Sequence, residues 1–291
     1  KVYTEFIFMS NNISLYIAAY NAEKTIEKSI KSILQQTLKP KEIIIINDCS
    51  TDKTLNLLKK FNQIKIINNK KNYGLAKSRN IALKYSKYNF LASIDSDVVC
   101  KKNWLETLFN TMVKKKADLI GGKLIDKYIK EPANHWRSYY LKQNWGDKQI
   151  NNPQFIFGAN FLLNKKKIKN LNIKYNETFR TNGEDVNFSK VLKSKNCNLY
   201  YEPRALCYHY QFDDITSLSK RYWRYSYYGA GLKKLTLTRL IRLILRQTKV
   251  LFYWMYRDLL KKNYHFLNIN LIMSYYFIIL CINEYLLNEK K

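Results

Sequence analysis

The feature that most constrains the fold is an alternation of short apolar segments with segments of helical spacing. Residues 13–20 (ISLYIAAY) form an apolar run, after which Ile26, Ile30 and Ile33 recur on one helix face. Residues 42–48 (EIIIIND) form a second apolar run of the kind that is buried on both faces of a parallel sheet. This order predicts an α/β protein whose parallel sheet is covered by helices.

The alternation continues along most of the chain. Further strands are predicted at 63–69, 88–95, 118–125, 152–166 and 199–210. Helices are predicted at 74–87 and near 102–115. Gly158 interrupts one of the later strands. Pro203 indicates that the strand at 199–210 lies at the edge of the sheet, because proline has no N–H to donate.

Acidic side chains follow two of these strands. Asp48 ends the second strand, and Asp95 and Asp97 end the fourth, one residue apart. Ligands of open α/β sheets bind beyond the carboxyl ends of the strands. Two carboxylates on such a loop can share Mg²⁺ or Mn²⁺, which in turn can bridge the oxygens of a diphosphate. The pair can equally be two solvated turn residues, since Asp-x-Asp is short and common.

The composition indicates a strongly basic protein. Lys and Arg number 51 against 22 Asp and Glu, a net charge of +29, which favours nucleic acid, anionic lipid or phosphorylated substrates as partners. Solvated surface lysine is an equally good interpretation. The chain has neither G-x-G-x-x-G nor G-x-x-x-x-G-K-S/T, so phosphate would be held in another way. Five scattered cysteines without C-x-x-C suggest a reducing cytosol and no zinc site.

The composition changes near residue 215. Residues 215–291 contain 14 Lys and Arg against 3 acids. Part of this region has the pattern of a basic amphipathic helix, whose cationic stripe consists of Arg239, Arg242, Arg246, Lys249 and Arg257. Residues 266–283 are uncharged for 18 residues, the lower limit for crossing a bilayer. Because Asn268, Asn270 and Ser274 interrupt this segment, we expect an interfacial or re-entrant anchor, with a single C-terminal span as the alternative.

Several motifs, taken in order, resemble the family 2 nucleotide-sugar glycosyltransferases of the GT-A fold. They are AYNAEKTIEKSIKSILQQTLKPKEIIIINDCSTDKT, NYGLAKSRNIAL, SIDSDV and NGEDVNFSKVLKSKNCNLYYEP, and the resemblance covers roughly residues 12–212. It implies a GT-A type, Rossmann-like, mostly parallel sheet flanked by helices. One departure is N-D-C-S, with Asn47 and Cys49, where the family usually has D-D-G-S.

The resemblance also implies roles in binding the donor. Tyr20 would stack near the nucleotide base, and Asp48 would accept a hydrogen bond from the N–H of its ring. Arg79 would lie close to the diphosphate. Asp95 would face the ribose or the metal, and Asp97 would ligate the metal directly. Each residue also has a structural interpretation, such as a packed loop aromatic for Tyr20 or a helix-surface cation for Arg79.

A second set of residues would act on the acceptor side. Inverting transfer needs a base opposite the departing diphosphate, and the resemblance assigns this role to Asp185, with Glu184 orienting the acceptor. Acids in a first helical turn also favour the macrodipole, which is the structural alternative. Gly158 would lie under the donor sugar or belong to a core strand. His209 would be a third metal ligand, a diphosphate contact or a structural residue.

The sequence thus predicts an N-terminal extension at 1–11, a GT-A catalytic domain at 12–214 and a helical region at 215–291 that associates with a membrane surface. The expected enzyme moves a sugar from a nucleotide donor, with UDP-sugar favoured, to a hydroxyl of a lipid-linked or cell-surface glycan at the cytoplasmic face of the membrane. The alternatives are transfer to a polyprenyl phosphate, a catalytically inactive scaffold of the same fold and a nucleic-acid-binding protein. No RRM, KH or helix-turn-helix signature supports the last of these.

Overall fold

The computed structural model describes residues 13–179, 182–228 and 235–289. The predicted extension at 1–11 lies outside the described residues. The chain forms two compact units, the first made of Lys1–Lys127 with Gln143–Gln211 and the second of Tyr128–Lys142 with Phe212–Lys291. The chain therefore leaves the first unit and returns to it before the C-terminal region begins.

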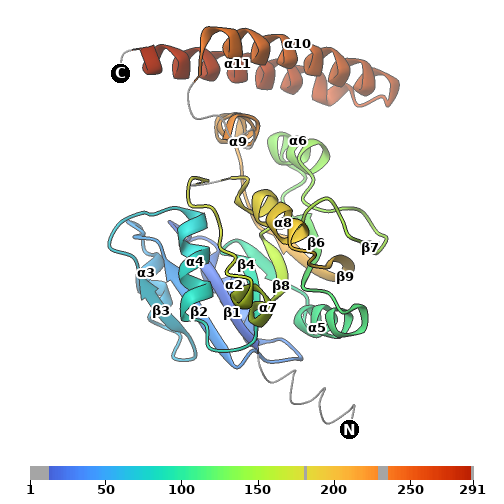
Figure 1. Cartoon of the computed structure of the whole chain (residues 1–291). Coiled ribbons are helices and arrows are strands. Elements are labelled where there is room, and N and C mark those ends of the chain that lie inside the picture. Colours follow the sequence, from blue (N-terminus) through green and yellow to red (C-terminus); the bar gives the residue numbers. More distant parts are fainter. Residues whose placement is uncertain (1–12, 180–181, 229–234, 290–291) are drawn as a thin grey trace. The chain divides into compact units, whose positions relative to one another are not determined.

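The first unit is built on a nine-stranded sheet in the order β3-β2-β1-β4-β8-β6-β9-β5, with β7 beside β9 (Figure 1). Its first half is a parallel ladder of β1 (Ile13–Ala19), β2 (Glu42–Asn47), β3 (Lys65–Asn68) and β4 (Phe90–Asp95). The connecting helices are α2 (Ile26–Leu34), α3 (Thr54–Leu58) and α4 (Leu75–Tyr85). This half matches the alternation in the sequence.

The second half of the sheet is mixed. Its strands are β5 (Val98–Cys100), β6 (Leu119–Asp126), β7 (Ile150–Asn151), β8 (Asn160–Asn164) and β9 (Leu199–His209). Strand β8 runs antiparallel to both β4 and β6, whereas β9 is parallel to β6. The flanking helices are α5 (Trp104–Lys115), α7 (Lys165–Asn170) and α8 (Glu184–Ser194). The α/β fold class predicted from the sequence is confirmed.

The prediction that the strand at 199–210 lies at the sheet edge is wrong. Strand β9 pairs with β6 on one side and with β5 and β7 on the other. Pro203 is accommodated because the β6–β9 register shifts there, from Gly122 opposite Glu202 to Lys123 opposite Leu206. A side chain at Gly122 would place its Cβ 2.1 Å from the carbonyl oxygen of Ala205, so this irregularity requires a glycine.

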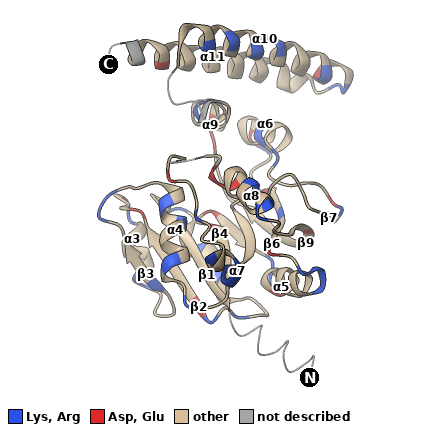
Figure 2. Cartoon of the chain, in the orientation of Figure 1, with Lys and Arg blue, Asp and Glu red and all other residues tan. Residues whose placement is uncertain are grey.

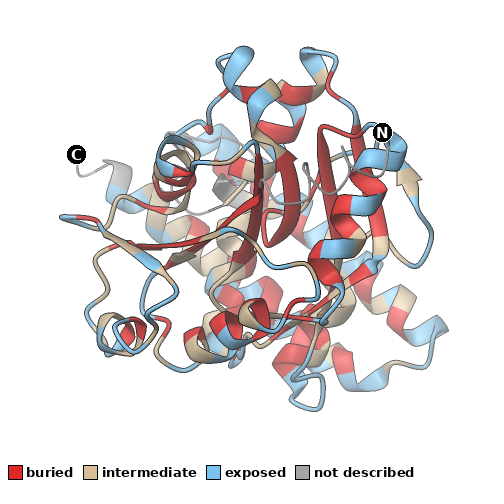
Figure 3. Cartoon of the chain, turned by 90° about the horizontal axis from the view of Figure 1, so that it is seen from below, coloured by how far each residue is buried: buried red, intermediate tan, exposed pale blue. Residues whose placement is uncertain are grey.

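The core of the first unit lies on both faces of the sheet. Successive residues of β1 alternate between the two faces, with Leu15 and Ile17 in one hydrophobic cluster and Tyr16 in the other. Ile26 and Ile30 of α2 are fully buried against the first cluster. Figure 3 shows buried residues along the central strands and exposed residues on the outer helix faces. Two-sided burial explains why these strands are continuously apolar.

The second unit is helical. It contains α6 (Pro132–Tyr140), α9 (Ile215–Tyr228), α10 (Leu237–Leu260), the 3₁₀ turn η1 (Tyr264–Phe266) and α11 (Leu267–Glu289). Trp136 is fully buried, and its ring contacts those of Tyr140, Tyr222 and Trp254. The aromatic residues thus give this unit a hydrophobic core of its own.

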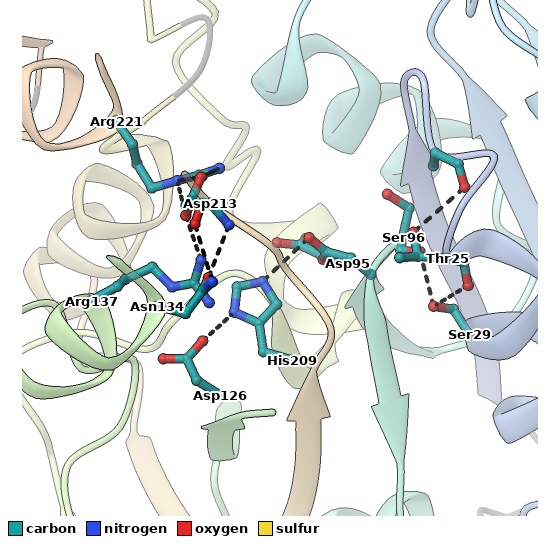
Figure 4. A network of polar contacts seen from close by, with 12 residues as sticks. Thr25, Ser29, Asp95, Ser96, Asp126, Asn134, Arg137, His209, Asp213 and Arg221 are labelled. Atoms are coloured by element: carbon teal, nitrogen blue, oxygen red, sulfur yellow. Dashed lines mark hydrogen bonds and ion pairs between the residues drawn. The ribbon is translucent and has the colours of Figure 1, made fainter. Parts of the chain in front are cut away.

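A buried ion-pair cluster lies where the chain enters the second unit for the last time. Asp213 is 2% exposed and pairs with Arg137 and Arg221 (Figure 4). Its backbone N–H donates to Asn134 Oδ1 at 2.9 Å, and its carbonyl accepts from Asn134 Nδ2 at 3.1 Å. These bonds join α6 to the segment before α9.

Candidate active site

The loops that follow β1 and β2 form one rim of the sheet. Asn21 Oδ1 accepts a hydrogen bond from the N–H of Thr51 at 2.8 Å, and the N–H of Ala22 donates to Thr54 Oγ1 at 2.7 Å. Tyr20 lies on this rim and is 50% exposed, so its ring is open to a ligand. Cys49 has φ of 62°, the left-handed conformation that favours glycine, at the position where the family pattern has glycine. The loop keeps this conformation in spite of the substitution.

Asp48 lies at the end of β2 and is almost fully buried. Its Oδ1 accepts from Asn69 Nδ2 at 2.7 Å and from the N–H of Tyr73 at 3.0 Å, and its Oδ2 accepts from the N–H of Gly74 at 2.8 Å. The carboxylate therefore fixes the segment that leads into α4. Its contact with a nucleotide base remains a prediction.

Arg79 lies at the centre of the site. The side chain is buried, so the alternative of a helix-surface cation is wrong. Nη1 donates to Tyr16 Oη at 3.1 Å and to the carbonyl of Gly158 at 2.7 Å. Nη2 lies 3.5 Å from Asp95 Oδ1, and Nε lies 3.4 Å from Glu184 Oε1. Burial lowers the pKa of Arg79, but these neighbours raise it well above its ordinary value, so the guanidinium stays charged.

The peptide of Gly158 connects Arg79 to the predicted base. Its carbonyl accepts from Arg79, and its N–H donates to Asp185 Oδ2 at 2.9 Å. A Cβ at this position would lie 2.5 Å from Arg79 Nη2. Glycine is therefore required by the close approach of the guanidinium to the backbone.

Two adjacent acids begin α8 in different environments. Glu184 is 2% exposed, and burial together with Asp185 raises the pKa of Glu184 to about 7, against the opposing effect of Arg79. Asp185 is half-buried and also accepts from the N–H of Val186 at 2.8 Å. Of the two, Asp185 is the acid that an acceptor can reach, whereas Glu184 lies against Arg79.

The strand register brings Asp97 and His209 together. Val98 of β5 lies opposite His209 of β9, and the N–H of Tyr210 donates to the carbonyl of Asp97 at 2.7 Å. His209 Nε2 lies 3.4 Å from Asp97 Oδ2, and its Nδ1 lies 3.2 Å from Asp126 Oδ1 (Figure 4). Burial lowers the pKa of His209, but Asp97 and Asp126 raise it to about 9.

The turn between Asp95 and Asp97 is held from α2. Ser29 Oγ donates to the carbonyl of Ser96 at 2.9 Å (Figure 4). Burial raises the pKa of Asp95, which Arg79 opposes and Asp97 reinforces. This turn therefore collects negative charge beside the Arg79 guanidinium.

The donor atoms near this turn suit a hard divalent cation. Carboxylate oxygens and an imidazole nitrogen are ligands for Mn²⁺ and related ions, and the contact of Asp126 with Nδ1 directs Nε2 of His209 toward Asp97. Among the described residues, no group of three or more His, Cys, Asp or Glu side chains is arranged to hold a metal ion. The metal site at Asp95, Asp97 and His209 remains a prediction. The chemical types of their donor atoms are consistent with it.

Sequence reasoning missed three residues that support the site. Asp126 contacts His209, Asn69 donates to Asp48, and Tyr16 Oη accepts from Arg79. Asp126 could have been found, because it follows the strand predicted at 118–125 in the same way that Asp95 ends its own. Tyr16 and Asn69 carry no local signal, since their roles depend on strands that pair across the sheet.

Comparison with known proteins places the chain in a family. Residues 14–184 match the model of glycosyl transferase family 2. An uncharacterized glycosyltransferase of Haemophilus influenzae is 30% identical over 187 residues, which are 58% of this chain and 58% of the relative. The Escherichia coli UDP-Glc:α-D-GlcNAc-diphosphoundecaprenol β-1,3-glucosyltransferase WfaP is 46% identical over 87 residues, 29% of this chain and 35% of that protein. The chain thus spans well under two thirds of the length of either relative.

A solved structure shares the fold. Staphylococcus aureus TarS in complex with UDP-GlcNAc superposes with a TM-score of 0.58 at 18% identity, covering 82% of this chain and 66% of that one. At this identity the likeness concerns the fold alone. Because the family model covers more than half of the chain and the α/β architecture agrees with it, the protein belongs to glycosyltransferase family 2.

Proposed function

We propose that this protein is an inverting glycosyltransferase that moves a sugar from a UDP-sugar to a hydroxyl of a lipid-linked or cell-surface glycan. The observation that carries the proposal is the bond between Asp185 Oδ2 and the N–H of Gly158, which holds an accessible carboxylate beside Arg79. The UDP-GlcNAc bound by TarS and the diphosphoundecaprenol-linked substrate in the name of WfaP support the donor and acceptor classes.

Asp185 acts as the general base. It takes the proton of the acceptor hydroxyl as the new bond to the sugar C1 forms and the bond from C1 to the diphosphate breaks. The N–H groups of Gly158 and Val186 hold one oxygen each of this half-buried carboxylate. The nucleoside diphosphate leaves with the bonding electrons, so the configuration at C1 is inverted.

Arg79 and Glu184 act as positioning residues. The guanidinium contacts Asp95 and the Gly158 carbonyl, which link it to the donor side and to the base. Glu184 pairs with Arg79 from the side of α8, so its predicted effect on the acceptor is exerted through Arg79 and Asp185. This buried network sets where the two reacting sides meet.

Asp95, Asp97 and His209 would hold Mg²⁺ or Mn²⁺, and the ion would neutralise charge on the diphosphate. The contact of Asp126 with Nδ1 of His209 would orient the imidazole toward such an ion. Tyr20 and Asp48 would receive the nucleotide base at the rim of β1 and β2. Family membership favours sugar transfer over the nucleic-acid-binding alternative. A lipid-linked acceptor would place the enzyme at the cytoplasmic face of the membrane.

Substitution of the base tests the proposal. We expect Asp185→Asn to lower kcat by about 10²- to 10⁴-fold while thermal stabilisation by UDP persists, because Asn keeps an acceptor for the Gly158 N–H but takes no proton. Asp147→Asn is the matched control, since Asp147 is an exposed carboxylate of the same unit. Turnover of a UDP-, GDP- or dTDP-sugar, measured with and without Mn²⁺, identifies the donor. Unchanged turnover by Asp185→Asn would reject the assigned base.

The nature of the product separates the two acceptor classes. Transfer to a glycan hydroxyl gives a glycoside, whereas transfer to a polyprenyl phosphate gives a phosphodiester that mild acid cleaves. We expect a product that withstands mild acid at the new linkage. A labile product would support the polyprenyl-phosphate alternative.

A further inference from the structure

Helix α10 has three distinct faces. One face is buried in the helical unit and includes Leu240, Leu243, Gln247, Trp254 and Asp258. A second face is an apolar stripe whose members are each at least 49% exposed, namely Leu237, Ile241, Leu245, Phe252 and Leu259. Beside it runs a cationic stripe of exposed residues, namely Arg239, Arg242, Arg246 and Lys249. Arg257, which the sequence assigned to this stripe, instead lies over the ring of Tyr140 at 4.4 Å.

The partner helix α11 differs from α10 in charge. Its sequence contains no Lys, Arg or Asp and has two acids near its end, Glu284 and Glu289, and Figure 2 shows it without basic residues beside the blue segments of α10. The face turned away from the core exposes large apolar side chains, among them Leu271, Tyr275 and Leu286. The segment Tyr264–Leu287 is long and apolar enough to cross a membrane, with a mean hydropathy of 1.7. Composition therefore leaves open whether it spans a bilayer or lies on one.

Polar contacts inside the helical unit decide against a span. Asn270 of α11 is fully buried, donates to Asp258 Oδ2 at 2.7 Å and accepts from Trp136 Nε1 at 2.7 Å. Ser274 Oγ accepts from Gln247 Nε2 at 2.9 Å. If α11 crossed a bilayer alone, these bonds would break and polar groups would enter hydrocarbon without partners. Helix α10 cannot cross the hydrocarbon, because four cations are exposed on one of its faces.

We propose that α10 and α11 form a hairpin that lies in the plane of an anionic membrane surface, without crossing it. The apolar stripe of α10 enters the boundary between headgroups and acyl chains, and the neighbouring cationic stripe binds lipid phosphates. A soluble polyanion would use the cationic stripe but not the apolar stripe, so the pair fits a lipid leaflet. This surface specifies the membrane location proposed above and does not depend on the sugar-transfer chemistry.

Vesicle flotation tests the choice of partner. The whole chain is expected to float with vesicles of phosphatidylcholine and phosphatidylglycerol, to bind far less to phosphatidylcholine alone, and to dissociate as salt rises. Equal binding to both compositions, or binding to neither, would overturn the proposal. Because no donor or acceptor is present, failure of this assay is independent of failure of the proposed activity.

Matched variants test the two stripes separately. Replacing Arg242, Arg246 and Lys249 by Gln is expected to weaken binding roughly fivefold per cation, on the order of 100-fold together. The control is Gln at Lys59, Lys102 and Lys114, which are exposed lysines of the first unit and change the net charge equally. An equal loss in the control would mean that total charge is responsible and would overturn the assignment of the surface.

The apolar stripe is tested in the same way. Leu245→Asn with Phe252→Asn is expected to lower vesicle affinity by about tenfold or more per side chain. Tyr85→Asn with Val113→Asn, at exposed positions of the first unit, is the control and should leave binding unchanged. If the stripe variant instead converts a dimer to a monomer, as measured by sedimentation, and the wild type binds no vesicles, the stripe is a contact between copies of the chain.

The depth of α11 distinguishes a surface hairpin from a span. Tyr275→Trp places a fluorophore near the middle of the helix, at a position that is 64% exposed. Its fluorescence is measured with phosphatidylcholines brominated either near the headgroup or near the chain end. After subtraction of the wild-type signal, we expect stronger quenching by the shallow bromines. Stronger quenching by the deep bromines would show a span and reject the in-plane hairpin.

Discussion

At the scale of single residues, the site depends on close packing around one buried cation. Arg79 contacts a hydroxyl, a backbone carbonyl and two carboxylates, and it leaves no room for a side chain at Gly158. Glu184 is held against this cation with a pKa raised to about 7. Substitutions at Gly158 and at Glu184 should therefore have different effects, one on the packing around Arg79 and the other on the pH dependence of stability.

Gly158→Ala should disturb the site strongly, although it adds only one methyl group. The new Cβ would lie 2.5 Å from Arg79 Nη2, so the guanidinium must move away from Asp95 and from the carbonyl that it now contacts. We expect the free energy of unfolding to fall by about 1–3 kcal/mol. We also expect kcat to fall, because Arg79 would no longer hold its contacts with Asp95 and the Gly158 carbonyl. Urea unfolding and steady-state kinetics measure the two. Gly146→Ala, where no atom lies within 4 Å, is the control and should leave kcat unchanged although its φ of 95° adds strain.

Glu184 should make stability depend on pH near neutrality. Its pKa rises from 4.5 to about 7 on folding, so between these values the folded state binds more protons than the unfolded chain. The free energy of unfolding contributed by this group therefore falls as pH rises from about 4.5 to 7. Compared with Glu184→Gln, the wild type should lose about 1–3 kcal/mol across this window, as measured by urea unfolding at several pH values. A pH-independent difference would show that Glu184 stays ionised.

At the scale of elements, the predictable part of the sheet is its parallel half. Strands β1 to β4 alternate with helices along the chain, and their apolar patterns were sufficient to locate them, although β4 pairs with β1 and not with β3. The place of β9 was mispredicted, because Pro203 indicates an edge only if the strand is regular. The register shift opposite Gly122 removes the proline from the ladder, and no local pattern reveals that shift.

The irregularity between β6 and β9 should tolerate one substitution and reject another. Pro203→Ala should change the free energy of unfolding by less than about 1 kcal/mol, since the proline makes no ladder bond and its effect is mainly on the unfolded chain. Gly122→Ala should cost at least about 2 kcal/mol, because its Cβ would meet the Ala205 carbonyl oxygen at 2.1 Å. Thermal unfolding of both variants makes the comparison. A large gain in stability in Pro203→Ala would show that the proline costs a ladder hydrogen bond, as it would in a regular strand.

At the scale of the whole molecule, the chain builds two compact units with separate hydrophobic cores. The α/β unit packs helices on both faces of its sheet, and the helical unit packs around Trp136. The sequence predicted a single boundary at 214–215. The helical unit also includes Tyr128–Lys142, a segment that comes between β6 and β7 along the chain. Each core should therefore have a stability of its own.

Core substitutions should shift different unfolding transitions. Trp136→Ala removes a fully buried ring and is expected to destabilise the helical unit by about 3–5 kcal/mol, leaving stabilisation by UDP intact. Leu162→Ala, in the core of the α/β unit, should lower the transition that UDP raises. Differential scanning calorimetry with and without UDP separates the transitions. A single transition shifted equally by both variants would show that the units unfold together.

The alternating elements and the carboxylates at the ends of β2 and β4 could be predicted from local periodicity and from the rule that parallel strands end at one edge of a sheet. The acids that begin α8 were identified through the resemblance of NGEDVNFSKVLKSKNCNLYYEP to the family. Three features could be seen only in the folded protein: Arg79 is buried, β8 runs antiparallel between β4 and β6, and Asp126 lies beside His209. Burial and the pairing of distant strands depend on how side chains pack across the whole sheet. A short stretch of sequence contains no information about that packing, because the contacting residues are far apart along the chain.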